Sequence, residues 1–263
     1  MVKLDNVTEE VLSVINDNKF SQSGAFNLRQ NGTSICHGDS EHIKIKKKAD
    51  KPGIDIYIDG KTKGEAVYIP VVVSVSGMTD LVYNDFYIED GADVCIIAGC
   101  GIHNSGCNES RHDGVHTFHV GKNANVRYEE KHYGEGSGSG ARVLNPVTNI
   151  FVGKNSVFTL DTAQIKGVDS TVRETTVELE ENAKDITIWE SEYQRQCMEL
   201  WGDNSAEKFA HASLLLNAWK QYEQTNIRLR YYWEQAWDEN GIRRTVLEED
   251  ENLIAIEELG EEV

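Results

Sequence analysis

The sequence has few basic residues and no long apolar run, and both shortages narrow its function. It contains 26 Lys and Arg residues against 44 Asp and Glu residues, which gives a net charge of −18. Nucleic-acid binding needs a basic footprint, and the only basic run, at 44–48, follows an Ile-Lys alternation typical of a strand with one solvated face. We therefore expect no nucleic-acid partner. No apolar stretch approaches the roughly 18 residues of a membrane span, so we also expect no membrane partner.

Cysteine is scarce as well, with five residues in the chain. The N-terminal residues are polar and acidic and do not resemble a secretory signal peptide, which favours a cytoplasmic location. In that compartment an odd number of cysteines argues against a disulphide framework. Metal binding, a persulphide or a plain structural role are the better expectations for these thiols.

Proline is rarer still, with three residues, and short β-rich runs are separated by glycine and asparagine turns. Four segments, at 89–96, 120–128, 152–160 and 179–188, share one pattern of a turn, a small residue and a run rich in β-formers. The small residues, spaced by 32, 32 and 27 positions, are Ala92, Ala124, Ser156 and Ala183, and a weaker copy surrounds Ala66. Repeats of this length are typical of solenoids. The pattern predicts an all-β core folded as a β-helix, with an irregular sandwich as the competing interpretation.

Both ends of the chain depart from this repeat. Residues 1–23 predict an N-terminal helical cap whose helix begins with Thr8 as N-cap residue. All five tryptophans lie at or beyond Trp189, and the apolar spacing at 191–240 predicts a helical segment. The remainder, 241–263, ends in an acidic stretch without basic residues and predicts a poorly ordered tail.

Most of the metal-capable side chains lie between Cys95 and His132, where three of the five cysteines and five of the eight histidines occur. Thiolates and imidazoles favour zinc, copper or iron–sulphur species. Cys100 and His103 form a C-x-x-H pair in an expected turn, and Cys107 follows four residues later. This spacing is that of a local metal loop, although it lacks the paired C-x-x-C typical of zinc.

The histidines further along fit an extended strand. His112 and His116 are an even number of residues apart and should point to one side, whereas His119 should point to the other. The structural alternative is that inward cysteines act as small apolar residues and that histidines complete polar turns. We expect Cys95, inside an apolar run, to be part of the core. Glu129, Glu130 and His132 could form a general acid/base set, but a solvated strand face is the simpler expectation.

Eight segments in order resemble the SufB/SufD family of the SUF iron–sulphur cluster assembly system, in its short single-protein form. They are GAFNLR at 24–29, KPGIDI at 51–56, VYNDFYI at 82–88, AGCGIHN at 98–104, HDGVHTF at 112–118, EKHYGEG at 130–136, LNPVT at 144–148 and QIKGVDS at 164–170. The resemblance covers about residues 24–190. It implies a right-handed parallel β-helix over 24–190, flanked by helical ends.

The resemblance also implies a function. Members of the family pair with one another and with an ABC-type ATPase, SufC, and nascent clusters are assembled on the complex. This chain would then be a scaffold that does not itself hydrolyse ATP, with a transient iron–sulphur cluster at Cys100, His103 and Cys107 or a metal ion at Cys100, His103, His112 and His116. A dimer with a second copy, or with a SufB/SufD-like partner, is expected.

Two other interpretations stay open. In one, His103, His112 and His116 bind a single ion in a metalloenzyme of the β-helix or cupin-like type. In the other, the chain is a truncated or frame-altered member of the family, because the sequence beyond about residue 190 contains none of the motifs expected in the late coils.

Overall fold

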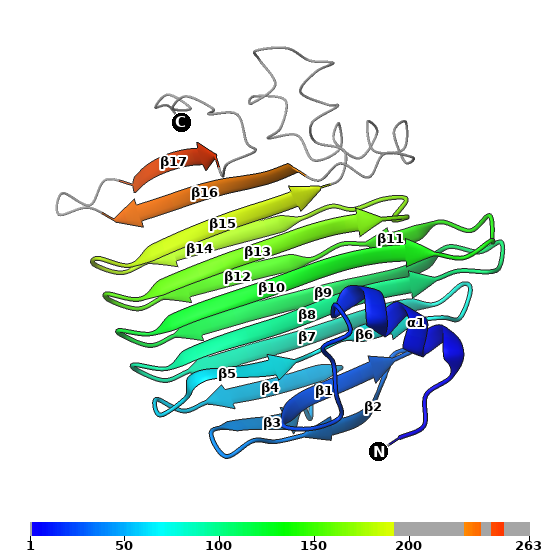
Figure 1. Ribbon diagram of the computed structural model, residues 1–263, viewed down its shortest axis with the longest axis horizontal. Helices are drawn as coiled ribbons and strands as arrows, with labels where there is room; N and C mark the ends of the chain where they lie inside the picture. Colours follow the sequence, from blue (N-terminus) through cyan, green and yellow to red (C-terminus); the bar gives the residue numbers. More distant parts are fainter. Residues whose placement is uncertain (1, 192–228, 238–242, 250–263) are drawn as a thin grey trace, which may run out of the picture.

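The computed structural model describes residues 2–191, 229–237 and 243–249 and consists of β-strands with one short N-terminal helix (Figure 1). The strands wind into a solenoid of about four turns, stacked from the N-terminal to the C-terminal end. Each full turn contributes one strand to each of two facing sheets. The β-solenoid predicted from the repeat is confirmed, and its right-handed sense stays a prediction.

The first sheet, sheet A, contains, in spatial order, β17 (Arg243–Glu249), β16 (Leu229–Trp237), β15 (Lys184–Ser191), β13 (Val157–Lys166), β10 (Asn125–Glu135), β8 (Asp93–His103), β5 (Lys63–Tyr68), β1 (Ala25–Gln30) and β2 (Thr33–Gly38), with β6 (Val71–Val73) paired to β1 and β8. The second sheet, sheet B, contains β14 (Glu174–Leu179), β12 (Val147–Val152), β9 (Ser110–Val120), β7 (Thr79–Ile88), β4 (Gly53–Ile58) and β3 (Ile43–Lys47), with β11 (Arg142–Leu144) paired to β9. Pairing is parallel within the coils and antiparallel between β1 and β2, β3 and β4, β15 and β16, and β16 and β17.

The strand register reproduces the predicted spacing. Asp93 pairs with Asn125, Asn125 with Val157, and Val157 with Lys184, each one residue after a marker of the repeat. The markers Ala92, Ala124, Ser156 and Ala183 are all buried at the turn into sheet A. The upstream copy was assigned wrongly. Ala66 pairs with Cys95, and Thr62 is the buried residue in the marker position, because Asp93 N donates to Thr62 O as Asn125 N donates to Ala92 O.

The residue before each marker has a left-handed backbone, which explains the recurring asparagine. Asn123, Asn155 and Asn182 have φ values of 53°, 58° and 58°, and their side-chain amides form a ladder along the turns. We expect Asn155→Ala to lower the free energy of unfolding by about 1–2 kcal/mol, because alanine tolerates this backbone poorly. Asn155→Gly should cost less, since glycine adopts it freely. Chemical denaturation of the two variants checks this, and equal losses would mean that the amide ladder matters more than the backbone.

The N-terminal helix α1 (Asn6–Ile15) is confirmed, but its cap is not Thr8. Asp5 is the N-cap residue, and its side chain accepts a hydrogen bond of 2.8 Å from Thr8 N, so that Thr8 lies within the first turn. The helix packs Val11 and Ile15 onto the outer face of β8 at Gly99 and Gly101. A side chain at either glycine would clash with the helix. Within the described ranges, no helix is long and apolar enough to cross a membrane.

The C-terminal part differs from the prediction where it is described. Within the expected helical segment 191–240, residues 229–237 form β16, which pairs antiparallel with β15. The aromatic residues of this stretch favour strands, and pairing satisfies the edge that β15 would otherwise expose. Within the expected acidic tail 241–263, residues 243–249 form β17. The rest of both segments lies outside the described residues.

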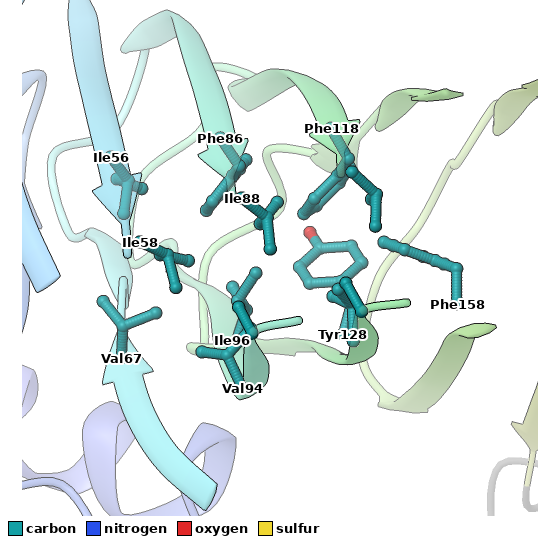
Figure 2. Close-up of a cluster of buried hydrophobic side chains, with 14 of the residues drawn as sticks. Ile56, Ile58, Val67, Phe86, Ile88, Val94, Ile96, Phe118, Tyr128 and Phe158 are labelled. Atoms are coloured by element: carbon teal, nitrogen blue, oxygen red, sulfur yellow. The ribbon is translucent and has the colours of Figure 1, made fainter. Parts of the chain in front are cut away.

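The core lies between the two sheets, where alternate residues of each strand point inward. Figure 2 shows side chains of one sheet facing those of the other across this space: Ile56, Ile58, Phe86, Ile88 and Phe118 from sheet B, and Val67, Val94, Ile96, Tyr128 and Phe158 from sheet A. Phe86 and Phe118 stack with ring centroids 4.4 Å apart. These residues fill only one half of each coil, at the side where the strands of sheet A begin.

Candidate functional site

The other half of the interior contains most of the buried polar side chains, next to a small apolar group that includes Val73, Ile102 and Leu144. This polar half follows from the same alternation continued along each strand. Beyond Ile96 on β8, the next inward positions are Ala98 and Cys100. In-register pairing then stacks three side chains from successive coils into each column of sheet A. One column contains Ala98, Glu130 and Thr162, and the next contains Cys100, His132 and Gln164. The facing positions of sheet B are polar as well: Asp80 with His112, and Asn84 with His116 and Thr148.

The first polar group is centred on Asp80, which is 3% exposed. Arg29 donates to it twice, from Nη2 to Oδ1 at 2.6 Å and from Nε to Oδ2 at 2.8 Å. His112 Nδ1 lies 3.1 Å from Asp80 Oδ2. Burial by itself would raise the pKa of Asp80, but the hydrogen bonds from Arg29 and His112 hold it well below its usual range. Asp80 is therefore a buried carboxylate that a cation neutralises.

The second polar group is centred on Glu130, which is 2% exposed. Arg173 donates from Nη1 to Glu130 Oε2 at 2.5 Å and from Nη2 to His132 Nδ1 at 2.9 Å. Tyr128 and Thr162 donate through their hydroxyls at 3.1 and 3.3 Å. Burial opposes ionisation of Glu130, yet the imidazole of His132 and the guanidinium of Arg173 hold its pKa well below the usual range.

Cys100 and His116 lie between these two groups and are uncharged. Burial, together with the charge of Glu130, raises the pKa of the Cys100 thiol, so it is protonated at neutral pH. Burial also lowers the pKa of His116 to about 4. Among the described residues, His112 Nε2 and His116 Nδ1 have no hydrogen-bond partner although both side chains are buried. A buried polar atom without a partner is costly, and the Gln164 side chain, in the column of Cys100 and His132, likewise has neither amide atom paired among the described residues.

A glycine separates the two imidazoles. Gly114 occupies the inward position between His112 and His116, and a Cβ there would lie 2.8 Å from His116 Nε2 and 3.5 Å from His112 Nε2. The surrounding space, closed by Cys100, Glu130 and His132, has no room for a water molecule. The site is a closed cluster of one thiol, three imidazoles and one carboxylate.

Three of the predicted site residues, Cys100, His112 and His116, meet in this cluster, and two do not. Cys100 and His103 both belong to strand β8 rather than to a turn, and their odd spacing places them on opposite faces. His103 is outside, with Nδ1 3.1 Å from Glu135 Oε1. Cys107 is exposed in the loop after β8. Neither the expected C-x-x-H metal loop nor the three-histidine site is therefore assembled. In the part of the chain that the structure describes, no group of three or more His, Cys, Asp or Glu side chains has a metal-binding arrangement.

Two further expectations are corrected by the register. Cys95 is not a core residue: it is half-buried on the outer face of β8, where its thiol lies 3.8 Å from Glu129 Oε1. Glu130 and His132, expected on a solvated face, are buried. Their spacing of two and four from the inward Tyr128 was the signal that could have placed them inside. The outward position of His119 relative to His112 and His116 is confirmed.

Comparison of the chain with protein-family models, curated proteins and solved structures finds no match.

Proposed function

We propose that this protein is a non-enzymatic scaffold for iron–sulphur cluster assembly that works in the cytoplasm with a SufC-like ABC ATPase. The resemblance of residues 24–190 to the SufB/SufD family motivates the proposal, and a β-solenoid is the fold that this resemblance implies. The scaffold would act as a dimer with a second copy or with a SufB/SufD-like partner. ATP hydrolysis would belong to the ATPase, and the cluster would be a transient cargo.

The observation that carries the proposal is the closed donor cluster around Cys100. One thiol and three imidazoles gather in a single stretch of the interior, whereas the other half of each coil is apolar. Soft sulphur and imidazole donors suit iron and sulphide chemistry. His112 Nε2 and His116 Nδ1, which have no hydrogen-bond partner, are two such donors not committed to other contacts.

The side chains around Cys100 are of the types that bind iron and sulphide, but the space between them is too small for either. The cluster around Cys100 has no room for a water molecule, and so none for iron or sulphide in the closed state. Loading at Cys100 therefore requires the coils around it to open. A shape change driven by the ATPase, as the resemblance implies, would supply that opening.

The test is anaerobic incubation of the full chain with ferrous iron and sulphide, with and without a SufC-like ATPase and ATP. We expect visible cluster absorption only when ATPase and ATP are present. Cys100→Ala should abolish it, whereas Cys36→Ala, which removes a half-buried thiol on β2, should retain it. Metal and sulphide analysis of the desalted protein gives the stoichiometry.

Three outcomes would contradict the proposal in different ways. Absorption lost in Cys107→Ala but kept in Cys100→Ala would place the ligand in the exposed loop instead. A protein that stays colourless with ATPase and ATP would reject the scaffold role and favour a truncated or frame-altered chain. Absorption without the ATPase would reject the requirement for opening.

A mononuclear metal site is the second candidate, and the unpartnered nitrogens of His112 and His116 favour it. It would place one ion between the two imidazoles, beside Cys100, and it too would require the packing around Cys100 to open, because the closed space does not admit a water molecule. Aerobically purified protein should then contain about one equivalent of zinc, copper or iron, and His116→Asn should lose it. Retention of the metal in His116→Asn, or its absence from the unmodified protein, would reject this candidate.

A further inference from the structure

A stack of four rings crosses the outer face of sheet B, away from the donor cluster. Tyr57, Tyr87, His119 and Phe151 come from β4, β7, β9 and β12 and lie in register. Successive ring centroids are 5.1, 5.1 and 5.5 Å apart, with interplanar angles of 15°, 8° and 6°. Each inner ring is therefore covered on both faces by its neighbours. Only the first and the last ring of the stack have a ring face that no other ring of the stack covers.

The two ends of the stack are different. At the first end, Lys46 Nζ lies 4.9 Å from the centroid of Tyr57, which is the geometry of a cation–π contact. At the second end, the in-register neighbour of Phe151 on β14 is Glu178, which has no ring. Among the described residues, no ring or cation is found on the far side of Phe151. This ring remains 38% exposed, a large apolar surface for a protein of high charge.

A groove of about 490 Å³ lies beside this end of the stack. Tyr87, His119 and Phe151 line it together with Glu89, Glu178 and Glu180. Two of these carboxylates accept backbone hydrogen bonds, Glu89 from Gly60 N and Glu180 from Lys154 N, which fixes their position at the rim. The groove thus combines an aromatic face with three negative charges and no lysine or arginine in its lining.

We propose that this groove is a docking site for an arginine-bearing basic segment of a partner protein. The guanidinium would take the place of the next ring in the stack, over Phe151, and pair with the carboxylate of Glu178. A planar guanidinium stacks on aromatic faces and binds carboxylates through two hydrogen bonds, which an ammonium group does not. Lys46 on Tyr57 provides a precedent for a cation at the opposite end of the same stack.

A second copy of this chain is a poor source of that segment. Its basic run in and just after β3 contains lysine but no arginine, and there Lys46 already contacts Tyr57 and Lys48 is buried between Asp55 and Asp85. The net charge of −18 also opposes self-association through an acidic groove. The proposal concerns a surface remote from Cys100 and does not rest on the iron–sulphur function.

The test is fluorescence anisotropy with a labelled peptide of alternating arginine and glycine, titrated with the full chain at 0.15 M salt. We expect a dissociation constant below 1 mM. Phe151→Leu and Glu178→Gln should each weaken binding about tenfold. The control is Tyr57→Leu, which removes a ring at the closed end of the same stack and should change binding less than twofold. Unfolding curves of the three variants check that each is folded.

A peptide with citrulline in place of arginine keeps the shape but loses the charge and should not bind. NMR signals of the His119 ring should shift on titration with the arginine peptide and stay unchanged with an equivalent glutamate peptide. Equal weakening in Phe151→Leu and Tyr57→Leu would show that the open end of the stack has no special role and would overturn the proposal. Unchanged binding in Phe151→Leu would show general charge attraction and would also overturn it. Absence of arginine-peptide binding below 1 mM would overturn it as well.

Discussion

Replacing Arg29 with methionine is expected to lower the free energy of unfolding by about 3–5 kcal/mol. The change removes both hydrogen bonds to Asp80 and leaves a carboxylate that is 3% exposed with only His112 beside it. Removing one partner of a buried pair costs more than the pair itself contributes, because the remaining charge has lost its water as well. Urea denaturation followed by far-UV circular dichroism measures the loss.

The matched control is Arg111→Met, which breaks the ion pair of Arg111 with Asp113 on the more exposed face of sheet B, the sheet that contains Asp80. Its cost should stay below about 1 kcal/mol, as for other solvent-screened pairs. Replacing Arg29 and Asp80 together with methionine and leucine should recover part of the loss. If Arg29→Met costs no more than Arg111→Met, the polar half of the interior contains enough water to solvate Asp80.

The same contacts predict the response to acid. The pKa of Asp80 is depressed in the folded protein, so its contribution is complete above the unfolded value of about 3.9 and disappears as the pH falls through the folded value. In Arg29→Met this contribution should be largely absent at all pH values. The stability difference between the unmodified protein and the variant should therefore shrink below about pH 4.

The repeat could be found in the sequence because its determinants are local. A buried small residue after a left-handed asparagine recurs at Ala124, Ser156 and Ala183, and both properties can be read from the residue type. The marker of the first repeat was not recognised in the sequence, because it is Thr62 and no asparagine precedes it. The helix cap was placed at Thr8 for a similar reason, since Asp5 and Thr8 are both good capping residues and only the backbone decides between them.

The site was only partly predictable, because local sequence does not determine which side of a strand points to the interior. Alternation showed that His112 and His116 share a side. Whether that side is the interior depends on the opposite sheet. For Cys100 and His103, a glycine-rich sequence suggested a turn, although Gly99 and Gly101 are there to admit helix α1 onto a continuous strand. Arg29 and Arg173 reach the site from the first and last coils, and no spacing rule connects residues so far apart.

Asp185→Val is expected to stabilise the protein at neutral and alkaline pH. In register, Asp185 continues the inward column formed by Val94, Val126 and Phe158, where the other coils bury apolar side chains. It is 3% exposed, its Oδ1 has no hydrogen-bond partner among the described side chains, and Thr187 donates to Oδ2 at 3.4 Å. Burial raises the pKa of Asp185 to about 7. The folded state therefore takes up a proton that the unfolded chain releases.

Because the pKa of Asp185 is higher in the folded state than in the unfolded state, its cost to stability increases with pH. Below the unfolded pKa of about 3.9 the carboxyl is neutral in both states and imposes no ionisation penalty. As the pH rises from there to about 7, folding must keep a proton that the unfolded chain has lost, and the penalty grows to at most about 4 kcal/mol. The gain from Asp185→Val should thus increase from pH 4 to pH 7 and then level off. Thermal or urea unfolding across that range measures it.

The control, Glu174→Val, removes an exposed carboxylate from the first position of β14, in the same part of the solenoid. Its effect should stay within about 0.5 kcal/mol and should not depend on pH. A gain from Asp185→Val that is equal at pH 4 and pH 8 would reflect apolar packing alone and contradict the raised pKa. The opposite pH dependences expected for Asp80 and Asp185 come from their partners. Burial opposes ionisation of both carboxyls, but the hydrogen bonds from Arg29 outweigh it at Asp80. At Asp185 the described side chains offer only the Thr187 hydroxyl, so burial prevails and favours the protonated form.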